Sequence, residues 1–325
     1  MRQSQIPYPI DSKEKTVDYR GGNIVNILVI HSHNANRGDE AAVKAMVDEL
    51  LIKYPGAKIT ISNNGFTPYP GMPENVIQID RFPKLESRIA QLEFFIVLLF
   101  KGKFALTKEA RKFIRALKEA DVVLHAPGGP SIGDTYFKAE KLYLWRLNLI
   151  RRMGIPYIFY APSMGPFNCA SRNKLRKEVI SGAERIILRD PISVKYVKDF
   201  LPGVEVEQAL DSALQHDIDI DKNERKYNNY PELKNFIENH EKCIGITITD
   251  LKWHPVHKNE KIIEQIPTAF KAFITQKVKE GYGVVFIPQL YGNLNDTKVM
   301  NDYMLDSDTF MIDAFSEERD TYFQQ

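Results

Sequence analysis

A short polar motif, NRGDE at residues 36–40, follows the apolar run 27–30 and precedes a segment with helical apolar spacing. A buried strand that leads through a polar loop into a helix is a common ligand site of α/β folds, since the first N–H groups of a helix attract anions. Gly38 permits a tight turn or close approach of a ligand. Asp39 also suits a helix N-cap. This motif alone therefore leaves capping and function equally open.

A second polar loop, HAPGGPSIGD, begins at His125 after an apolar strand. Gly128 and Gly129 would let a ligand lie against backbone N–H groups. Ser131 can donate a hydrogen bond, and Asp134 can accept one, for instance from a sugar hydroxyl. The loop lacks the Gly-Lys-Ser/Thr of a P-loop. A tight turn followed by a helix cap is the alternative interpretation.

Three further motifs carry candidate binding residues. Met164 and Gly165 lie in APSMGPF, where a glycine before proline suggests a constrained backbone close to another group. Arg189 lies at the predicted carboxyl end of a strand, where a guanidinium can hold a carboxylate or phosphate. A structural pair between Arg189 and Asp190, or a bridge from Arg189 between strands, is the alternative. Gln289 follows a later strand, in the weaker motif IPQLYG.

His31 and His33 have the spacing that places two side chains on one side of a strand end. A metal site needs more ligands, and no third residue is spaced to supply one. We therefore expect no metal site.

The elements that position these motifs are alternating strands and helices, which predict a doubly wound α/β fold with a parallel sheet covered on both faces. Ligands of such sheets lie beyond the carboxyl ends of the strands, and the loops 31–38, 127–138 and 162–170 occupy those ends. The predicted strands are 24–30, 57–61, 76–79, 121–126, 156–161, 185–188, 204–208, 243–249, 284–288 and 309–312. The predicted helices are 39–54, 85–104, 107–120, 139–152, 172–182, 192–200, 262–279, 298–304 and one beginning at 316.

The length of 325 residues and a change in composition predict two domains. We expect a tail at 1–22, a first Rossmann-like domain at 23–216, a polar connection at 217–241 and a second Rossmann-like domain at 242–325. The last of these holds about three strands and ends within a predicted helix, so we expect the second domain to be incomplete and the chain to be a fragment.

Composition excludes several classes of protein. A formal net charge of +2 gives no support for nucleic-acid binding. Cys169 and Cys243 form no CxxC pair, which favours a reducing, cytoplasmic environment, and the N-terminus lacks a signal peptide. The apolar run 94–100 is too short to span a bilayer. It is flanked by lysines and arginines, so residues 94–103 form either a buried helix or a contact with an anionic membrane surface.

Taken in order, these motifs resemble the polysaccharide pyruvyl transferase family over about residues 24–325. NRGDEA is similar to the family's loop after its first strand, HAPGGPSIGD to its glycine-rich loop and APSMGPF to its GxGP segment, with Ser163 in the first glycine place. ILRDPISVKYV resembles its R-D-x-x-S helix start, and DSA, IGIT and IPQ follow at the expected positions. The family's later Arg-x-His motif and a following lysine are absent.

The resemblance implies two Rossmann-like domains arranged as in the glycosyltransferase-B group, with the site between them. It implies transfer from phosphoenolpyruvate, a co-substrate rather than a cofactor, to hydroxyls of a saccharide acceptor, either free or lipid-linked, to form a pyruvate ketal. The acceptor would be a cell-surface polysaccharide or its precursor. Arg189 would then hold the anionic donor and Asp39 would contact or deprotonate the acceptor hydroxyl. The substrate-binding candidates are Asn36, Gly38, Gly128, Gly129, Ser131, Asp134, Met164, Gly165 and Gln289.

Two other functions remain open at this point. The first is a nucleotide-sugar glycosyltransferase of the same architecture, which would need a nucleotide pocket in the second domain. The second is a non-catalytic carbohydrate-binding remnant.

Overall fold

The computed structural model describes residues 25–64, 68–84, 87–215, 219–254, 257–290 and 295–312. Strand β1 (Asn26–Ser32) lies inside the main sheet, between β2 and β4, where its side chains are buried on both faces. Ile27 and Val29 pack into one buried cluster, whereas Leu28 and Ile30 pack into another. A strand buried on both faces requires helices above and below it.

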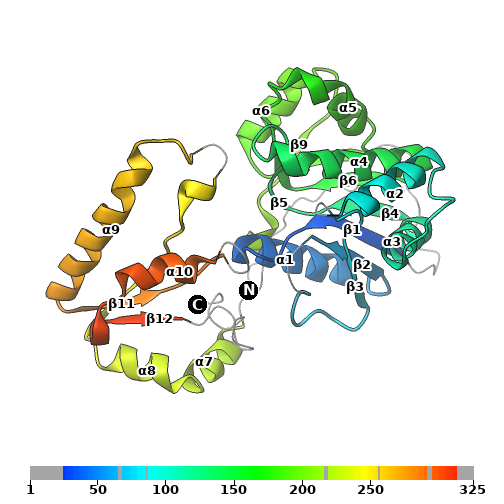
Figure 1. Ribbon diagram of the computed structural model, residues 1–325. Helices are drawn as coiled ribbons and strands as arrows, with labels where there is room; N and C mark the ends of the chain where they lie inside the picture. The colour runs from blue at the N-terminus through cyan, green and yellow to red at the C-terminus, as the bar shows by residue number, and fades with distance from the viewer. Residues whose placement is uncertain are drawn as a thin grey trace.

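The main sheet has seven strands in the order β3-β2-β1-β4-β6-β8-β9, and all neighbours are parallel. This confirms the predicted α/β fold with parallel sheets (Figure 1). All carboxyl ends of a parallel sheet lie at one edge, so the loops that follow these strands can share a site. The strands after β1 are β2 (Lys58–Asn63), β3 (Val76–Asp80), β4 (Val122–His125), β6 (Tyr157–Tyr160), β8 (Arg185–Leu188) and β9 (Glu207–Gln208).

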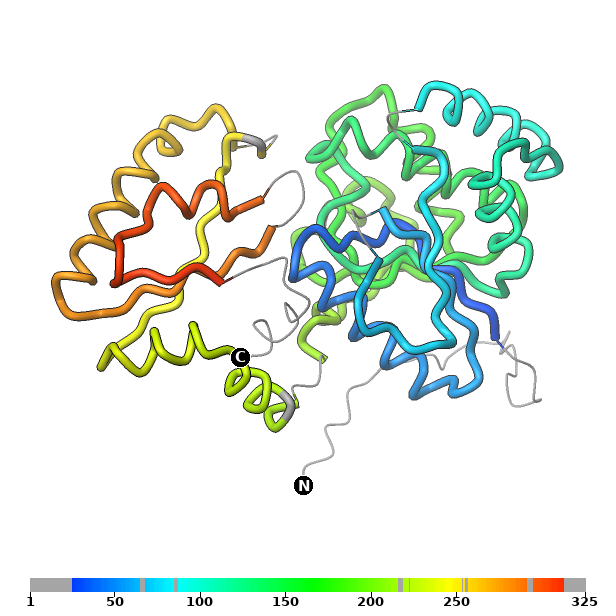
Figure 2. The backbone as a smooth tube through the Cα atoms, turned by 60° about the horizontal axis from the view of Figure 1, so that its bottom comes forward, coloured from blue at the N-terminus to red at the C-terminus, as the bar shows by residue number. Residues whose placement is uncertain are grey.

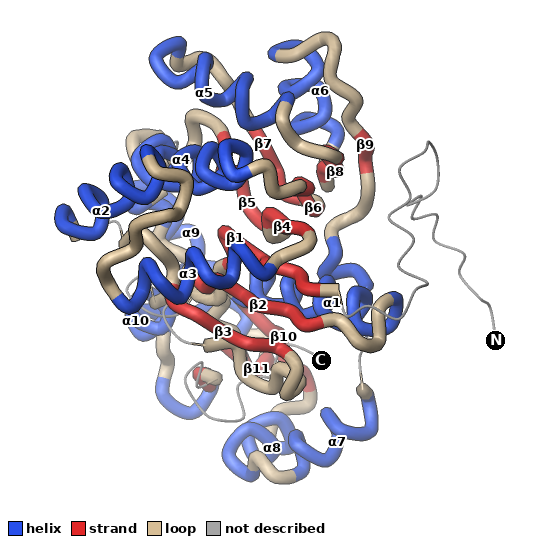
Figure 3. Tube along the Cα trace, turned by 90° about the vertical axis from the view of Figure 1, so that its right-hand side faces the viewer, coloured by secondary structure: helices blue, strands red, loops and turns tan. Residues whose placement is uncertain are grey.

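Helix α1 (Arg37–Lys53) covers one face of this sheet through Val43, Met46 and Val47. Five other helices contribute to the larger cluster on the opposite face, and Figure 3 shows α1 and α3 on opposite sides of the strands. These helices are α2 (Arg88–Leu99), α3 (Lys108–Glu119), α4 (Phe137–Met153), α5 (Ala170–Ser181) and α6 (Pro191–Phe200).

Two segments predicted as loops contain short strands instead. β5 (Gly128–Ile132) and β7 (Pro162–Met164) form a separate parallel pair beyond the main sheet. Each follows a main-sheet strand, β4 and β6, after a break of one or two residues. Glycine and proline in both segments concealed them from propensity arguments, because these residues are poor strand formers. The pairing holds the second and third motifs side by side.

A buried ion-pair network holds the segment that follows β5. Glu140 of α4 is fully buried, and its carboxylate accepts hydrogen bonds from Arg172, Arg176 and the backbone N–H of Gly133. Arg176 also donates to Asp134 at 2.7 Å. Burial makes each of these charges dependent on its partners. The network thus fixes the turn between β5 and α4.

A second unit, formed by the described residues from 219 to 312, contains a three-stranded parallel sheet in the order β10-β11-β12. Figures 1 and 2 show it beside the first unit, which comprises the described residues up to 215. Ile274 of α9 and Met300 of α10 pack on one face of this sheet, against Val284 and Phe286. The elements are β10 (Lys242–Ile246), α9 (Ile262–Lys279), β11 (Tyr282–Phe286), α10 (Asp296–Met300) and β12 (Thr309–Met311). Short 3-10 helices are η1 (Ser212–Gln215), η2 (Leu251–Trp253), η3 (Asn301–Tyr303) and η4 (Asp306–Asp308).

The segment 217–241, predicted as a polar connection, contains two helices, α7 (Ile220–Asn228) and α8 (Pro231–Glu238). Leu233 of α8 is buried against Val285 and Ile312 on the second sheet. The segment 217–241 contains too few apolar residues to show a clear helical period in the sequence. The interpretation of this segment as a connection between domains stays a prediction, as do the predicted domain limits. The predicted tail at 1–22 and the helix beginning at 316 lie outside the described residues.

Replacement of Glu140 by alanine should strongly destabilise the protein, because it leaves the buried Arg176 without its main partner. We expect a loss of about 3–5 kcal/mol in the free energy of unfolding, measured by chemical denaturation. Glu178→Ala is the matched control, since the pair of Glu178 with Arg151 is partly exposed and should contribute less than about 1 kcal/mol. Equal losses in both variants would contradict a supporting role for the network.

Candidate functional site

The first turn of α1 is capped by Asn36, not by Asp39 as the sequence suggested. The Asn36 side-chain oxygen accepts from the backbone N–H groups of Gly38 at 2.8 Å and Asp39 at 3.3 Å. The Asn36 carbonyl accepts from the N–H of Glu40. Asn36 can cap because its backbone is extended and its side chain reaches back over the turn. Asn36 and Gly38, both predicted to bind substrate, thus form the helix cap.

The remaining N–H group of this turn binds the second unit. Arg37 donates its backbone N–H to the carbonyl of Gln289 at 3.1 Å, and Asn36 forms a β-bridge with Leu290. Buried Asp296 holds that loop, because its carboxylate accepts from the N–H groups of Gln289 and Leu290. All four N–H groups of the first turn therefore have partners within the chain. The expectation that this helix end offers free N–H groups to an anionic ligand was wrong.

Asp39 lies against the glycines of the second motif. The N–H of Gly129 donates a hydrogen bond to its carboxylate. A Cβ at Gly128 would lie 2.9 Å from Asp39 Oδ1, and the φ of +137° there also favours glycine. A glycine at 128 is thus required for the Asp39 carboxylate to occupy this position. Gly128 and Gly129, which the sequence suggested would lie against a ligand, lie against the Asp39 carboxylate of the protein itself.

The pKa of Asp39 is raised from its ordinary value of 3.8 to about 6. Burial is the largest cause, because it disfavours the charged form. The charge of Arg189 opposes this shift, the charge of Asp211 adds to it and the bond from Gly129 opposes it. A carboxyl group that titrates near neutrality can both accept and release a proton. Asp39, Arg189 and Asp211 therefore form one electrostatic group.

Arg189 follows directly after β8, and two neighbouring loops hold its guanidinium. Its Nε donates to Ser163 Oγ at 2.9 Å, and its Nη1 donates to Asp211 at 2.5 Å. About a quarter of the side chain is exposed. Among the described residues no hydrogen-bond partner occupies Nη2. The fixed guanidinium thus retains a donor for a carboxylate or phosphate.

Asp190 caps α6 rather than pairing mainly with Arg189. Its carboxylate accepts from the backbone N–H and the hydroxyl of Ser193 and from the hydroxyl of Ser163. Burial would raise the pKa of Asp190, but these hydrogen bonds and the charge of Arg189 lower it overall. Ser163, which stands in the place of a family glycine, therefore bridges Asp190 and Arg189.

Two predicted saccharide contacts have partners within the protein. Ser131 is buried, and its hydroxyl bonds to Nε2 of His125 at 2.7 Å. One oxygen of Asp134 accepts from Arg176, and the other accepts from the N–H groups of Asn168 and Cys169. The geometry gives both residues structural roles. Their predicted contacts with a sugar have no support from these positions.

Met164 and Gly165 also serve the packing of the third motif. The Met164 side chain is buried in the main core, and its N–H donates to Ser193 Oγ. Gly165 has φ +88°, and a Cβ there would lie 2.7 Å from the Tyr196 ring. The constrained backbone predicted at Gly165 is confirmed, and the close neighbour is Tyr196 of α6.

His31 and His33 face the same side of the β1 end, as their spacing predicted. The ring of His31 lies 4.5 Å from that of Tyr143 and 4.7 Å from that of His125, and His33 Nε2 bonds to Tyr143 Oη at 2.8 Å. Burial lowers the pKa of His31 well below its ordinary value, and lowers that of His33 and of His125 to about 4. These rings are neutral packing groups near pH 7. In the part of the chain that the structure describes, no cluster of His, Cys, Asp or Glu is arranged to hold a metal ion.

Sequence reasoning missed two neighbours of Asp39. Asp211 pairs with Arg189, and only its place in the short DSA motif marked it. Tyr136 lies at the N-cap of α4, and its pKa is raised by burial and by the charge of Asp39. Its ring also contacts His254 of the second unit, with 6.1 Å between the ring centroids. Tyr136 had no distinguishing pattern in the sequence, because its position depends on contacts distant along the chain.

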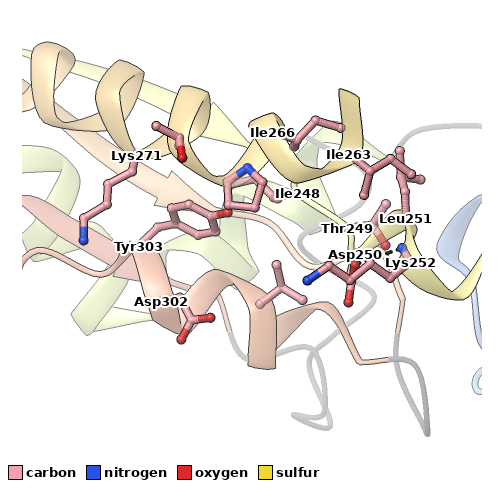
Figure 4. A pocket seen from close by; sticks show the side chains of 13 residues that line it. Ile248, Thr249, Asp250, Leu251, Lys252, Ile263, Ile266, Lys271, Asp302 and Tyr303 are labelled. Atoms are coloured by element: carbon pink, nitrogen blue, oxygen red, sulfur yellow. Dashed lines mark hydrogen bonds between the residues drawn. The ribbon is translucent and has the colours of Figure 1, made fainter. Parts of the chain in front are cut away.

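A pocket of about 340 Å³ lies in the second unit, between the residues that follow β10, helix α9 and η3. Figure 4 shows the Tyr303 ring on one wall, with Lys271 and Asp302 toward one end and Asp250 and Lys252 toward the other. Two cations and two carboxylates balance in charge. The pocket thus lacks a strong preference for an anionic ligand.

The chain matches the family described as polysaccharide pyruvyl transferase over residues 36–320. No protein in the curated comparison matches it.

Solved structures show the fold with low identity. UDP-GlcNAc 2-epimerase from Neisseria meningitidis, bound to UDP-GlcNAc, has a TM-score of 0.53 at 12% identity, over 92% of this chain and 75% of the epimerase. The S. aureus MnaA–UDP complex has a TM-score of 0.51 at 13% identity, over 89% of this chain and 68% of MnaA. The chain is similar to these proteins in its glycosyltransferase-B-like arrangement, and at such identity the likeness concerns the fold alone.

Replacement of Asp39 by asparagine should stabilise the protein, and more so as the pH rises. The raised pKa means that the folded state binds a proton more tightly than the unfolded state, so the wild type loses stability as the pH rises from 3.8 through about 6. Between about pH 5 and about pH 7.5, the advantage of the variant in unfolding free energy should grow by roughly 1–1.5 kcal/mol. Denaturation at both pH values measures it.

Asp199→Asn is the control for this comparison, because the Asp199 carboxylate is largely exposed on α6. A change with pH as large as that of Asp39→Asn would show that the effect is not specific to the buried carboxyl group. A constant difference between Asp39→Asn and the wild type, or a loss of stability typical of a missing helix cap, would contradict the buried, titrating carboxylate.

Proposed function

Because the chain belongs to the polysaccharide pyruvyl transferase family, a family of transferases, we propose that it transfers the enolpyruvyl group of phosphoenolpyruvate to saccharide hydroxyls and forms a pyruvate ketal. The family match supports the resemblance that the motifs carried. The observation that carries the proposal is the juxtaposition of Asp39, with a pKa of about 6, and the fixed guanidinium of Arg189. This arrangement offers both a proton acceptor and an anion-binding group.

Arg189 holds the donor in this proposal. Phosphoenolpyruvate carries a carboxylate and a phosphate, so its binding requires cationic donors. The contacts with Ser163 and Asp211 hold the guanidinium in one orientation before the donor arrives. A group that needs no reorganisation loses less entropy on binding. Asp211 also limits the positive charge at the site, which favours release of the phosphate product.

Asp39 acts as the proton acceptor for the acceptor hydroxyl. One hydroxyl oxygen forms a bond to C2 of the donor while the methylene carbon takes a proton. The bond from C2 to the phosphate oxygen then breaks, and phosphate leaves with the electron pair. The second hydroxyl oxygen bonds to C2 and completes the ketal, so the two hydroxyl protons end on the methyl group and the phosphate. These steps consist of proton transfers and of bond changes at C2, and phosphoenolpyruvate takes part in them as a co-substrate.

Of the remaining predicted contacts, Gly128 and Gly129 stay the best supported, because they lie directly beside Asp39. Gln289 brings the second unit to the α1 end of the site through its backbone. We propose that the saccharide enters between these loops. The protein would act in the cytoplasm on a polysaccharide or its precursor, and a lipid-linked acceptor would require contact with the inner face of the membrane.

Replacement of Arg189 by alanine should weaken binding of phosphoenolpyruvate by at least about tenfold, the loss expected for one charged hydrogen-bonding group. Calorimetric titration of the full chain with phosphoenolpyruvate measures it. Arg185→Ala is the matched control, because Arg185 begins strand β8 whereas Arg189 follows its end. The Arg185 side chain pairs with Glu207 of β9. This control variant should bind the donor as the wild type does.

The same titration with UDP-N-acetylglucosamine separates this function from a nucleotide-sugar glycosyltransferase. Equal donor affinity in Arg189→Ala and the wild type would remove the role of Arg189. Binding of the nucleotide sugar without binding of phosphoenolpyruvate would overturn the proposed function.

A further inference from the structure

Helix α2 and the turn after it expose large apolar side chains to solvent. We call six of them the α2 patch: Ile89, Leu92, Phe95, Leu99, Phe100 and Phe104, which are between 43% and 77% exposed. A contiguous group of this kind is unusual on a protein surface and indicates a binding surface.

The opposite face of α2 is also apolar. Phe94 and Val97 are fully buried in the main core, where Phe94 contacts the rings of Phe82 and Trp145. The core therefore fixes the helix, and the α2 patch is an additional apolar surface. The residues of the α2 patch are not needed to pack the helix on the protein, because its buried face already does so. Figure 1 shows α2 on the side of the first unit that faces away from the second unit.

Cationic residues are concentrated in the part of the chain that forms the α2 patch. Residues 81–118 contain ten lysines and arginines but three acidic residues, while the whole chain has a net charge of only +2. One of those acids, Glu93, is buried beneath the helix, where it accepts from the N–H groups of Leu106 and Thr107. The exposed cations next to the patch include Arg88, Lys101 and Lys103. Positive charge is thus concentrated at this surface.

Helix α4 continues the same pattern. Phe95 of the patch contacts the Trp145 ring, with 4.6 Å between the ring centroids. Lys141 Nζ lies over the same tryptophan ring, 4.4 Å from its centroid. Tryptophan beside lysine is the combination that membrane interfaces favour, since the ring is apolar and the ammonium group stays in water. Trp145 therefore lies at the border between the apolar patch and its cationic surroundings.

We propose that the α2 patch docks on an anionic lipid bilayer, with α2 lying in the plane of the interface. An interfacial helix needs an apolar face and nearby cations that attract anionic headgroups. No helix among the described residues is both long and apolar enough to cross a bilayer. A second copy of the chain is a poorer occupant, because a twofold contact would bring the two cationic borders together. Docking would give the site access to membrane-bound acceptors, and it does not depend on the identity of the donor.

Flotation of the full chain with vesicles of phosphatidylcholine, with or without phosphatidylglycerol, tests the proposal. The wild type should float only with the anionic vesicles, and less so at high salt. The double variant Leu92→Glu/Leu99→Glu should lose at least about tenfold in vesicle binding. Ile52→Glu/Ile77→Glu is the matched control, because both residues are exposed and apolar but lie outside the patch. It should bind as the wild type does.

Absence of flotation by the wild type, or equal flotation of both double variants, would overturn the proposal. A change of oligomeric state in Leu92→Glu/Leu99→Glu without a change in flotation would assign the patch to self-association instead. No donor is present in this experiment, so its failure leaves the proposed transferase reaction untouched.

A second measurement does not require changes in the patch. Trp253→Phe leaves Trp145 as the only tryptophan of the chain. Anionic vesicles with brominated acyl chains should then quench its fluorescence, because Trp145 borders the docked surface. Fluorescence that these vesicles leave unchanged would contradict docking through this face.

Discussion

The closed N-terminus of α1 is the constraint on which the site depends. Its first N–H groups bond to Asn36 and to the carbonyl of Gln289, which comes from the second unit. A helix end of this kind commonly binds an anionic ligand, but here its own chain occupies it. Because these bonds fix the first turn, the Asp39 side chain must lie against Gly128 and Gly129. The first turn of α1 therefore both contacts the second unit and determines the position of the Asp39 carboxylate.

Because the chain itself occupies the helix end, Arg189 is the group that we propose for binding the anionic donor. Ser163 and Asp211 hold the guanidinium, and Ser163 also bonds to the cap of α6 at Asp190. Strand β7 and the segments after β8 and β9 thus position one cation, and the first turn of α1 positions one carboxyl group. The two groups are coupled electrostatically, since the charge of Arg189 opposes the burial that raises the pKa of Asp39. Fold and electrostatics are linked through these few contacts.

The sequence was sufficient to predict the parallel sheet, because strands and helices alternate along the chain. Motif order also placed Asp39 and Arg189 at strand ends. It failed where a partner comes from far along the chain: the bond from Arg37 to Gln289, the pairing of Arg189 with Asp211 and the burial of Met164. It also assigned the local cap of α1 to Asp39 instead of Asn36. Local pattern also missed α7 and α8, whose few apolar residues pack on a sheet formed by later segments.

Titration of the Asp39 carboxyl carbon by NMR, in the presence and absence of phosphoenolpyruvate, tests the account most directly. Without the donor, Asp39 should titrate at a pKa of about 6, because burial outweighs the charge of Arg189. With the donor bound at Arg189, its negative charge should raise this pKa further. An ordinary pKa for Asp39 that phosphoenolpyruvate does not change would contradict both the buried carboxylate and its coupling to an anionic donor.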